Sequence, residues 1–411
     1  MSKVKNLLKK LCPNGVEYIE ITELFNIKNG YTPSKANDSF WSNGTVPWFR
    51  MEDIRQNGRI LSDSIQHVTK DAVKGELFPE NSIIIATTAT IGEHALITVP
   101  SIGNQQLTYL YLKEKYKNSI NMKYIYHYCF ILDDYCKKNI KMGGFPAVLI
   151  SEFKKFKFAI PPIEVQNEIV QILDKFGELE AELEAELEAR KSQYEFWRGK
   201  LINNDNNIVE LGDVCKIVGR IGFRGYTRND LVENKEDGAI SLSPANIKNN
   251  NIYYDNPTYV SWEKYEESPE IMIDNNDIIF CKTGSTVGKV ALVQKLPHKA
   301  TINPQLVVLK ELKCNPSYLA YLMGSDSFQS DVLRIKGLGS IPTISQKDLA
   351  KLKISLPSRD KQDKVANILD RFNTLINDIT EGIPAEIELR RKQYEYYRNE
   401  LLSFKELNTN E

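Results

Sequence analysis

Two stretches of the chain carry apolar residues at helical spacing over many turns. In the first, apolar side chains recur from Ile169 to Leu201 in steps that are mostly three and four, which is typical of a coiled-coil seam. The pattern predicts one helix from about Ile163 to Ile202, roughly 60 Å long at about 1.5 Å per residue. Pro161 and Pro162 suit its start, because proline fits the first helical turn.

The second stretch repeats this pattern from Val365 to Leu401 but contains two helix breakers. Gly382 and Pro384 stand between its two apolar runs. Proline cannot donate the helical hydrogen bond and clashes with the preceding turn. We therefore expect a kink or break at this point.

The segments before these helices show a mixed pattern. Short apolar runs at Ser82–Ala86 and Asp277–Cys281 predict strands, and longer periodic runs near Met122–Cys136 and Pro316–Arg334 predict helices. The asparagine-rich stretch Asn203–Asn207 is expected to be a linker. The fold class is thus α+β, with two mixed α/β blocks and two long helices whose apolar seams are typical of a coiled coil.

The chain contains an internal repeat. Ile160–Phe176 aligns with Leu356–Phe372 with 6 identities in 17 positions, and Arg190–Ile202 aligns with Arg390–Leu402 with 6 in 13. Fainter similarity links the blocks upstream, as in NQQL (Asn104–Leu107) and NPQL (Asn303–Leu306). Each copy is a globular block followed by a long helix, and the blocks have diverged more than the helices. Two copies with antiparallel helices would be related by a pseudo-twofold axis.

The repeat sets the expected domain boundaries. These are a basic N-terminal arm at 1–15, a first globular domain at 16–160, a central helix with its linker at 161–207, a second globular domain at 208–356 and a distal helix at 357–411.

Composition narrows the classes of function. Of 411 residues 42% are hydrophobic, which excludes wholesale disorder, and a net charge of -1 excludes a uniformly basic DNA binder. The charge is uneven: residues 161–202 hold 10 acidic and 5 basic side chains. There is no apolar run long enough to span a membrane, and the start does not resemble a secretory signal. The six cysteines form no CxxC pair, which favours free thiols in a reducing cytoplasm.

The sequence offers no convincing catalytic centre. The segment Gly284–Val290 resembles a phosphate loop but is one residue short, with Val290 in place of the magnesium-binding Ser or Thr, so a strand followed by a turn fits it better. Asn315–Tyr318 (NPSY) resembles a methyltransferase loop but is better explained as a helix start at Pro316. Glu152–Lys154 has the form of a nuclease triplet without a partner aspartate, and the four histidines have no metal-ligand spacing.

Within the first long helix, LEAE-LEAE-LEAR forms a tandem of tetrapeptides from Leu179 to Arg190, with apolar positions at Leu179, Leu183 and Leu187. An ordinary solvated helix would look the same. Alternatively, the tandem is a spacer of adjustable length, because one unit adds about 6 Å with little change of face.

Taken together, these blocks resemble the specificity (S) subunit of type I restriction–modification systems over essentially the whole chain. The opening LCPNGVEYIEITELF, the NGYTPSKAN and VPWFRMEDI segments and the helix pattern PPIEVQNEI…ILDKF…RKSQYEFWR carry the resemblance. In the second block, GRIGFRGYTRND departs from the family's opening element.

The resemblance implies a function without chemistry of its own. Each globular domain would read one half of a split double-stranded DNA target, and the antiparallel helices would hold the domains apart as a ruler. Two modification subunits would bind the chain and methylate adenines with S-adenosylmethionine. Restriction subunits would join to cleave unmodified DNA with ATP and magnesium, so we expect no cofactor and no metal in this chain, and no membrane contact.

Two sets of residues are candidates for contacts. Arginine is the commonest reader of guanine edges and glycine permits close approach, so we expect DNA contacts from Tyr31, Ser34, Lys35, Trp48 and Arg50 in the first domain and from Arg220, Arg224, Tyr226 and Arg228 in the second. The aromatic helix ends, with Tyr194, Trp197, Arg198, Tyr394, Tyr397 and Arg398, are expected to dock against a globular domain or a modification subunit, the former being the default.

Two other classes remain open. The chain could be the recognition half of a fused restriction–methylation enzyme, although the missing cofactor and nuclease motifs argue against it. It could also be a coiled-coil adaptor that binds protein only, although two α/β blocks of about 145 residues would then lack a purpose.

Overall fold

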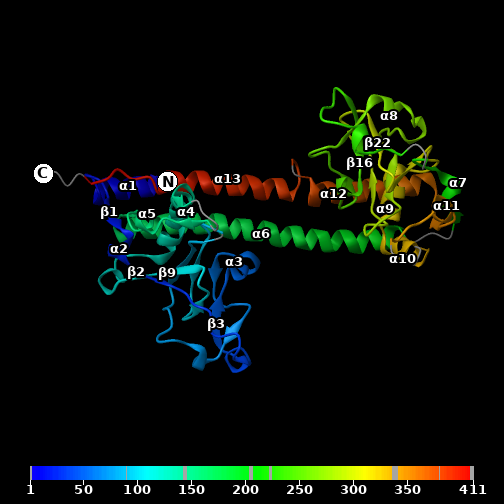
Figure 1. Ribbon diagram of the computed structural model, residues 1–411. Helices are drawn as coiled ribbons and strands as arrows, with labels where there is room; N and C mark the ends of the chain where they lie inside the picture. Colours follow the sequence, from blue (N-terminus) through cyan, green and yellow to red (C-terminus); the bar gives the residue numbers. More distant parts are fainter. Residues whose placement is uncertain are drawn as a thin grey trace. The chain divides into compact units, whose positions relative to one another are not determined.

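The structure, a computed structural model, describes residues 2–88, 90–141, 146–202, 207–221, 225–335, 341–378 and 380–407. The chain forms two compact units (Figure 1). Unit 1 comprises residues 1–182 and 388–411, and unit 2 comprises residues 183–387. Each unit therefore holds one globular block, the helical segment that follows it, and a helical segment that follows the other block.

The elements of unit 1, in chain order, are α1 (Ser2–Leu11), β1 (Glu17–Glu20), α2 (Ile21–Leu24), β2 (Phe25–Asn29), η1 (Asp38–Phe40), β3 (Val46–Phe49), α3 (Met51–Asn57), β4 (Ile60–Leu61), β5 (His67–Val68), η2 (Lys70–Ala72), β6 (Ser82–Ala86), β7 (His94–Ile97), β8 (Ile102–Gly103), β9 (Leu107–Leu112), η3 (Glu114–Tyr116), α4 (Met122–Lys138), β10 (Ile140–Lys141), β11 (Ala147–Val148), α5 (Ile150–Phe153), β12 (Lys157–Ile160), the first half of α6 (Ile163–Ile202) and the end of α13 (Ile383–Leu401).

A mixed five-stranded sheet forms the centre of unit 1, in the order β2-β9-β6-β7-β4. Its strand β6 is buried along its whole length, as expected for an uninterrupted apolar run. One face of the sheet packs against α4 and the start of α6, and the other face carries a second apolar cluster around Tyr109. A smaller sheet, β5-β3-β8, lies beside it and contains the parallel pair β3 and β8.

The elements of unit 2 are the second half of α6, β13 (Ile208–Glu210), α7 (Leu211–Val214), β14 (Lys216–Gly219), η5 (Arg228–Asp230), β15 (Leu231–Val232), β16 (Gly238–Leu242), η6 (Pro244–Asn246), β17 (Ile247–Lys248), β18 (Asn251–Ile252), β19 (Tyr259–Ser261), α8 (Trp262–Glu266), η7 (Pro269–Ile271), β20 (Ile278–Cys281), β21 (Val290–Leu292), β22 (Ala300–Ile302), β23 (Leu306–Lys310), α9 (Pro316–Met323), α10 (Asp326–Ile335), α11 (Gln346–Ala350), β24 (Lys353–Ser355), α12 (Arg359–Asn377) and the start of α13.

Unit 2 repeats the topology of unit 1. Its main sheet has the order β14-β23-β20-β21, which corresponds strand for strand to β2-β9-β6-β7. Its second sheet, β15-β19-β16-β22, again contains a parallel pair, β16 and β22. A two-stranded ribbon closes each block, β1 with β12 and β13 with β24. The duplication predicted from the sequence therefore extends through the diverged blocks.

The long helices agree with the pattern of the sequence. Helix α6 is continuous from Ile163 to Ile202, and the distal stretch is divided into α12 and α13, with Gly382 directly before α13. The expected helix near Pro316 is two helices, because α9 ends before Gly324 and α10 begins at Asp326. The expected linker at 203–207 is described only at Asn207.

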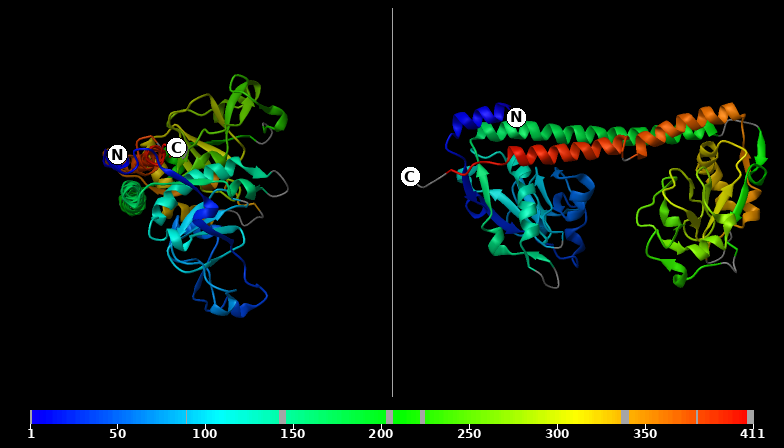
Figure 2. Two further views of the ribbon diagram at one scale, coloured as in Figure 1. Left: turned by 90° about the vertical axis from the view of Figure 1, so that its left-hand side faces the viewer. Right: turned by 90° about the horizontal axis from the view of Figure 1, so that it is seen from above.

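Within unit 1 the helices pack antiparallel, as Figure 2 shows for the end of α13 beside the first half of α6. Phe176 stacks on Tyr397 with ring centroids 5.4 Å apart, and one turn further along α6 Glu180 pairs with Arg391 at 2.6 Å. The residue numbers of the contacts decrease along α13 as they increase along α6, so the two helices run antiparallel. The basic N-terminal segment forms α1, which packs Val4 into the core and pairs Lys3 with Glu168 of α6.

Candidate nucleic-acid interface

The first-unit candidates lie around the strand β3. Tyr31 follows β2, and its hydroxyl accepts a hydrogen bond from the Lys74 backbone N–H at 2.6 Å. Ser34 and Lys35 are exposed in the loop that precedes the short 3₁₀ helix η1. These three residues remain accessible for a contact with DNA. Lys74, which sequence reasoning missed, also places its ammonium group 5.9 Å from the centroid of the Tyr31 ring.

Trp48 does not fit the expected DNA contact, because its side chain is buried within β3. Its indole Nε1 donates to the Tyr31 carbonyl oxygen at 3.1 Å, and Trp41 packs edge-on against it with centroids 4.9 Å apart. Isolated aromatic residues beside a strand give no sequence signal that separates a buried ring from an exposed one. Trp48 supports the loop that carries Tyr31.

Arg50 follows β3 directly and caps α3. Its backbone N–H donates to the Asp53 carboxylate at 2.7 Å, and its guanidinium lies 5.4 Å from the Trp48 ring centroid. Its Nη2 pairs with the partly exposed Glu52 at 2.9 Å. Its Nε is buried and has no hydrogen-bond partner among the described residues. Arg50 is thus held at the end of β3 with hydrogen-bonding capacity left over.

Arg220 contradicts the expectation for the second unit. Its side chain is only 6% exposed, and its Nε and Nη2 donate to the Ile302 carbonyl oxygen at 3.3 and 3.2 Å. It also lies over the Tyr226 ring, 5.1 Å from the centroid, and burial lowers the pKa of its guanidinium. The glycines around it suggested an exposed loop, but the second sheet covers the side chain. Arg220 is therefore a structural residue in this conformation.

The other second-unit candidates differ in their accessibility. Tyr226 is partly buried, and its hydroxyl is 2.8 Å from Ser241 Oγ. Arg228 is exposed at the start of η5, where Thr227 and Asp230 form a capping box. Arg224 lies outside the described residues. The structure thus brings Arg220, Tyr226 and Ser241 together and leaves Arg228 at the surface.

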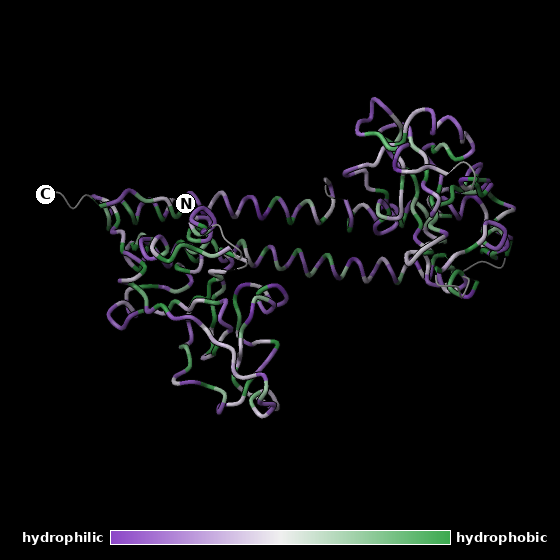
Figure 3. The backbone as a smooth tube through the Cα atoms, in the orientation of Figure 1, coloured by the Kyte–Doolittle hydropathy of each residue, from purple (hydrophilic) through white to green (hydrophobic). Residues whose placement is uncertain are grey.

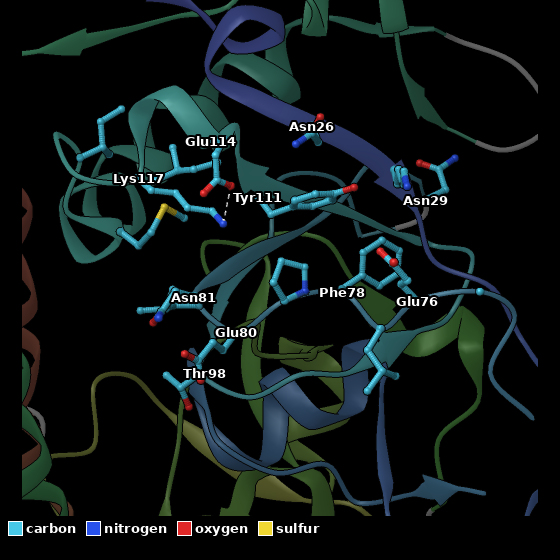
Figure 4. A pocket seen from close by; sticks show the side chains of 18 of the residues that line it. Asn26, Asn29, Glu76, Phe78, Glu80, Asn81, Thr98, Tyr111, Glu114 and Lys117 are labelled. Carbon is cyan, nitrogen blue, oxygen red and sulfur yellow. Dashed lines mark ion pairs between the residues drawn. The ribbon is translucent and has the colours of Figure 1, made fainter. Parts of the chain in front are cut away.

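A groove of about 1350 Å³ opens on unit 1 beside Tyr31 (Figure 4). Phe78 and Tyr111 form part of its wall, and Phe78 is also stacked on Tyr109 at 3.8 Å. Its lysines are matched by acidic residues, and Lys117 pairs with Glu114 at 2.7 Å. Such a mixed lining does not resemble a phosphate cradle, and sequence patterns gave no sign of the groove.

The predicted docking residues near the end of α13 pack against their own unit. The Tyr394 hydroxyl lies 2.9 Å from His127 Nδ1, and His127 Nε2 lies 2.9 Å from Asp174. Burial lowers the pKa of His127 against the opposing effect of Asp174, which favours the neutral ring. Nε2–H then donates to the carboxylate, and Nδ1 accepts from Tyr394. Arg398 lies over the Phe130 ring, 4.7 Å from its centroid.

Unit 2 builds the corresponding cluster from the end of α6. Tyr194 packs against Tyr321 and Phe372, with centroids 6.4 and 6.5 Å apart, and Tyr321 donates to Asp370 at 2.7 Å. Arg198 lies over the Tyr194 ring at 5.4 Å. The Tyr and Arg residues of both helix ends therefore dock within one unit each.

Trp197 behaves differently, because 44% of it is exposed. Its neighbour Phe196 is also exposed and packs edge-on against it, with centroids 5.4 Å apart. Tyr396 is exposed on α13. These rings form an accessible aromatic surface on each helix.

A glutamine anchors each long helix to its globular block, which sequence reasoning missed. Gln166 Oε1 accepts from the Asn121 N–H at 2.9 Å, and its Nε2 donates to Pro161 at 2.7 Å. Gln362 makes the same two bonds, with Asn315 at 2.8 Å and the carbonyl oxygen of Pro357 at 2.7 Å. The signal was available, because both glutamines are identical positions of the repeat.

The leucines of the LEAE tandem differ in their burial. Leu179 is 42% exposed, whereas Leu183 and Leu187 are partly buried, and Leu187 packs against the core of unit 2. Most of the middle of the helix is hydrophilic (Figure 3). Pairs on the same helix, such as Arg190 with Glu186 at 3.2 Å, stabilise it only slightly.

Two of the motifs that we set aside, the phosphate-loop-like segment and NPSY, have structural roles. Lys289 of the phosphate-loop-like turn donates to the Ile247 carbonyl oxygen at 3.1 Å. Asn315 caps α9 by accepting from the Tyr318 N–H at 2.9 Å. Over the described ranges, no group of three or more metal-ligating side chains could hold an ion, and no helix has the length and apolar character needed to cross a membrane. All six cysteines are free thiols.

Comparisons with known proteins match most of the chain to one family. The family model described as "Type I restriction modification DNA specificity domain" matches twice, at residues 13–189 and 203–389. The EcoprrI specificity subunit of Escherichia coli is 37% identical over 399 residues, which is 93% of each chain. The EcoR124I/EcoR124II specificity subunit of the same species is 34% identical over 70% of this chain and 72% of its own.

Solved structures show the same fold. A chain from a study of complex assembly and conformational transition of the type I restriction–modification system aligns with a TM-score of 0.63 at 14% identity, over 95% of this chain and 98% of its own. The S subunit from Mycoplasma genitalium aligns with a TM-score of 0.50 at 14% identity, over 94% and 96%. The chain therefore belongs to the specificity subunits of type I restriction–modification systems, and it is a non-catalytic subunit with two target-recognition domains.

Proposed function

We propose that each globular block reads one half of a bipartite DNA target and that the long helices set the distance between the halves. The observation that carries the proposal is a shared topology with different surfaces. Both units share the order of four strands in the main sheet and the same glutamine anchor, but unit 1 exposes Ser34 and Lys35, whereas unit 2 exposes Arg228. A shared frame with different surface residues suits two different half-sites.

The accessible candidate residues of both units are suited to DNA. Lys35, Arg228 and Arg50 supply positive charge for phosphate or base edges, and Tyr31 and Ser34 supply hydroxyl groups. The acidic side chains at the middle of α6 would repel phosphate, so this part of the helix should stand off the duplex or be covered by a partner.

We also propose that two modification subunits bind the helices and that restriction subunits join them. The exposed rings of Phe196, Trp197 and Tyr396 support a protein contact there, because aromatic residues are enriched at interfaces. S-adenosylmethionine, ATP and magnesium would bind the partner subunits, with no cofactor in this chain. A complex that binds and modifies chromosomal DNA would be located in the cytoplasm.

The test is a mobility-shift selection with a pool of random-sequence duplexes, using the chain alone and with its modification subunit. We expect the complex to enrich a motif of two fixed halves and an unspecified spacer. A protein-only adaptor would enrich no sequence in either sample, which would contradict the proposal. Methyl transfer from S-adenosylmethionine by the chain alone would instead indicate the fused enzyme.

A further inference from the structure

The parallel strand pair in each unit ends at an edge from which two turns leave. In unit 1, Trp48 and Phe49 of β3 lie beside Ile102 and Gly103 of β8. In unit 2, strand β16 lies beside β22 in the same parallel direction. Because parallel strands end at the same edge, the residues that follow them come together.

The turn after the second strand of each pair is the same in both units. The Asn104 N–H donates to the carbonyl oxygen of Phe49 at 2.9 Å, and the Asn303 N–H donates to that of Leu242 at 2.8 Å. The Asn104 side chain then accepts from the Gln106 N–H at 3.1 Å, as Asn303 does from Gln305 at 3.0 Å. Phe49 and Leu242 are therefore equivalent residues.

The turn after the first strand also matches. The Arg50 N–H donates to the Asp53 side chain at 2.7 Å, and the Ser243 N–H donates to Asn246 at 2.9 Å. A backbone hydrogen bond runs in the opposite direction. The Asp53 N–H donates to the carbonyl oxygen of Arg50 at 3.1 Å, and the Asn246 N–H donates to that of Ser243 at 3.0 Å. Asp53 is fully buried and also accepts from the Ile65 N–H at 2.6 Å, which fixes the turn in unit 1.

We propose that Arg50 and Ser243 are the same position of the duplicated frame and that this position reads one base in each half-site, so that the difference between them helps to make the two half-sites different. The inference rests on the proposed function of the two blocks. It adds Ser243, which no pattern in the sequence singled out, and it makes Asp53 and Asn246 positioning residues.

The two side chains have different recognition chemistry. A guanidinium can bond to both O6 and N7 of guanine, whereas a serine hydroxyl gives a single bond that either donates or accepts. The Arg50 guanidinium lies over Trp48, and its pair with Glu52 is partly exposed and therefore weak enough to exchange for a base edge. Ser243 Oγ lies 3.0 Å from Asn246 Oδ1 and is partly buried, which suits a short-range contact.

The experiment compares the sequence motifs methylated by the complex of this chain with its modification subunit, for wild type, Arg50→Ala and Ser243→Ala. We expect Arg50→Ala to lower discrimination at one base of one half-site by roughly 10- to 100-fold. Ser243→Ala should relax one base in the opposite half-site by a smaller factor. The spacer and all other positions should stay unchanged.

Two control variants keep the outcomes separate. Arg50→Lys retains the charge but not the fork of donors, so it should lose discrimination as Arg50→Ala does, even if the alanine variant is unstable. Arg55→Ala removes an exposed charge from the same helix and should leave the motif intact. The inference would be overturned if Arg50→Ala and Ser243→Ala altered recognition in the same half-site, or if neither of them altered recognition of any base. A wild-type complex that methylates no bipartite motif would instead overturn the proposed function.

Discussion

At the scale of single residues, the internal repeat identifies residues that support the fold better than it identifies residues that contact DNA. Gln166 and Gln362 are identical in the two copies because each satisfies the same backbone groups at the start of a long helix. Arg220 and Trp48 carry no such signal, and their chemistry alone suggested surface contacts. Their burial results from strands that pair far along the chain, which no local pattern reveals.

We predict that Gln166→Ala destabilises unit 1 by about 1–3 kcal/mol, because the partly buried N–H of Asn121 loses its acceptor and the carbonyl oxygen of Pro161 loses its donor. Urea unfolding of the full chain measures the change. Gln171→Ala, an exposed position on the same helix, should change stability by at most about 0.5 kcal/mol. Equal effects of the two substitutions would contradict the anchoring role.

At the scale of elements, helices were predictable and sheet order was not. The start and end of α6 followed from Pro161, Pro162 and the apolar period, and the break before α13 followed from Gly382 and Pro384. Strand β6 was visible as an apolar run. Its neighbour β7 is the next strand along the chain, but its other neighbour β9 follows β8 and also pairs with β2, so the order of the sheet depends on tertiary pairing.

The continuous helix α6 leads to a prediction about spacing. Deleting one tetrapeptide, Leu183–Glu186, removes about 6 Å of helix and turns its two ends by only about 40° relative to each other. B-DNA rises about 3.4 Å per base pair, so the unspecified spacer of the target should shorten by one or at most two base pairs.

Sequencing of the methylated sites from cells with the deleted chain measures the spacer. Both half-site sequences should be unchanged, because the deletion touches neither globular block. An unchanged spacer with retained activity would show that the tandem is an ordinary solvated helix. Altered half-sites would also contradict the role of the helix as a spacer.

At the scale of the whole molecule, each unit is completed by the helix end that follows the other block. His127 of the first block meets Tyr394, and Tyr321 of the second block meets Tyr194. The sequence revealed the duplication, but either tyrosine could have packed against its own block. The reciprocal exchange follows from antiparallel packing, which brings the end of one copy's helix to the start of the other's.

The central claim is that two different blocks on one duplicated frame read two different half-sites. Methylome sequencing of a host that carries this chain with its modification subunit tests it most directly. The account predicts one motif of two unlike halves with a spacer of fixed length and a methylated adenine in each half. A single uninterrupted motif, or two identical halves, would contradict it.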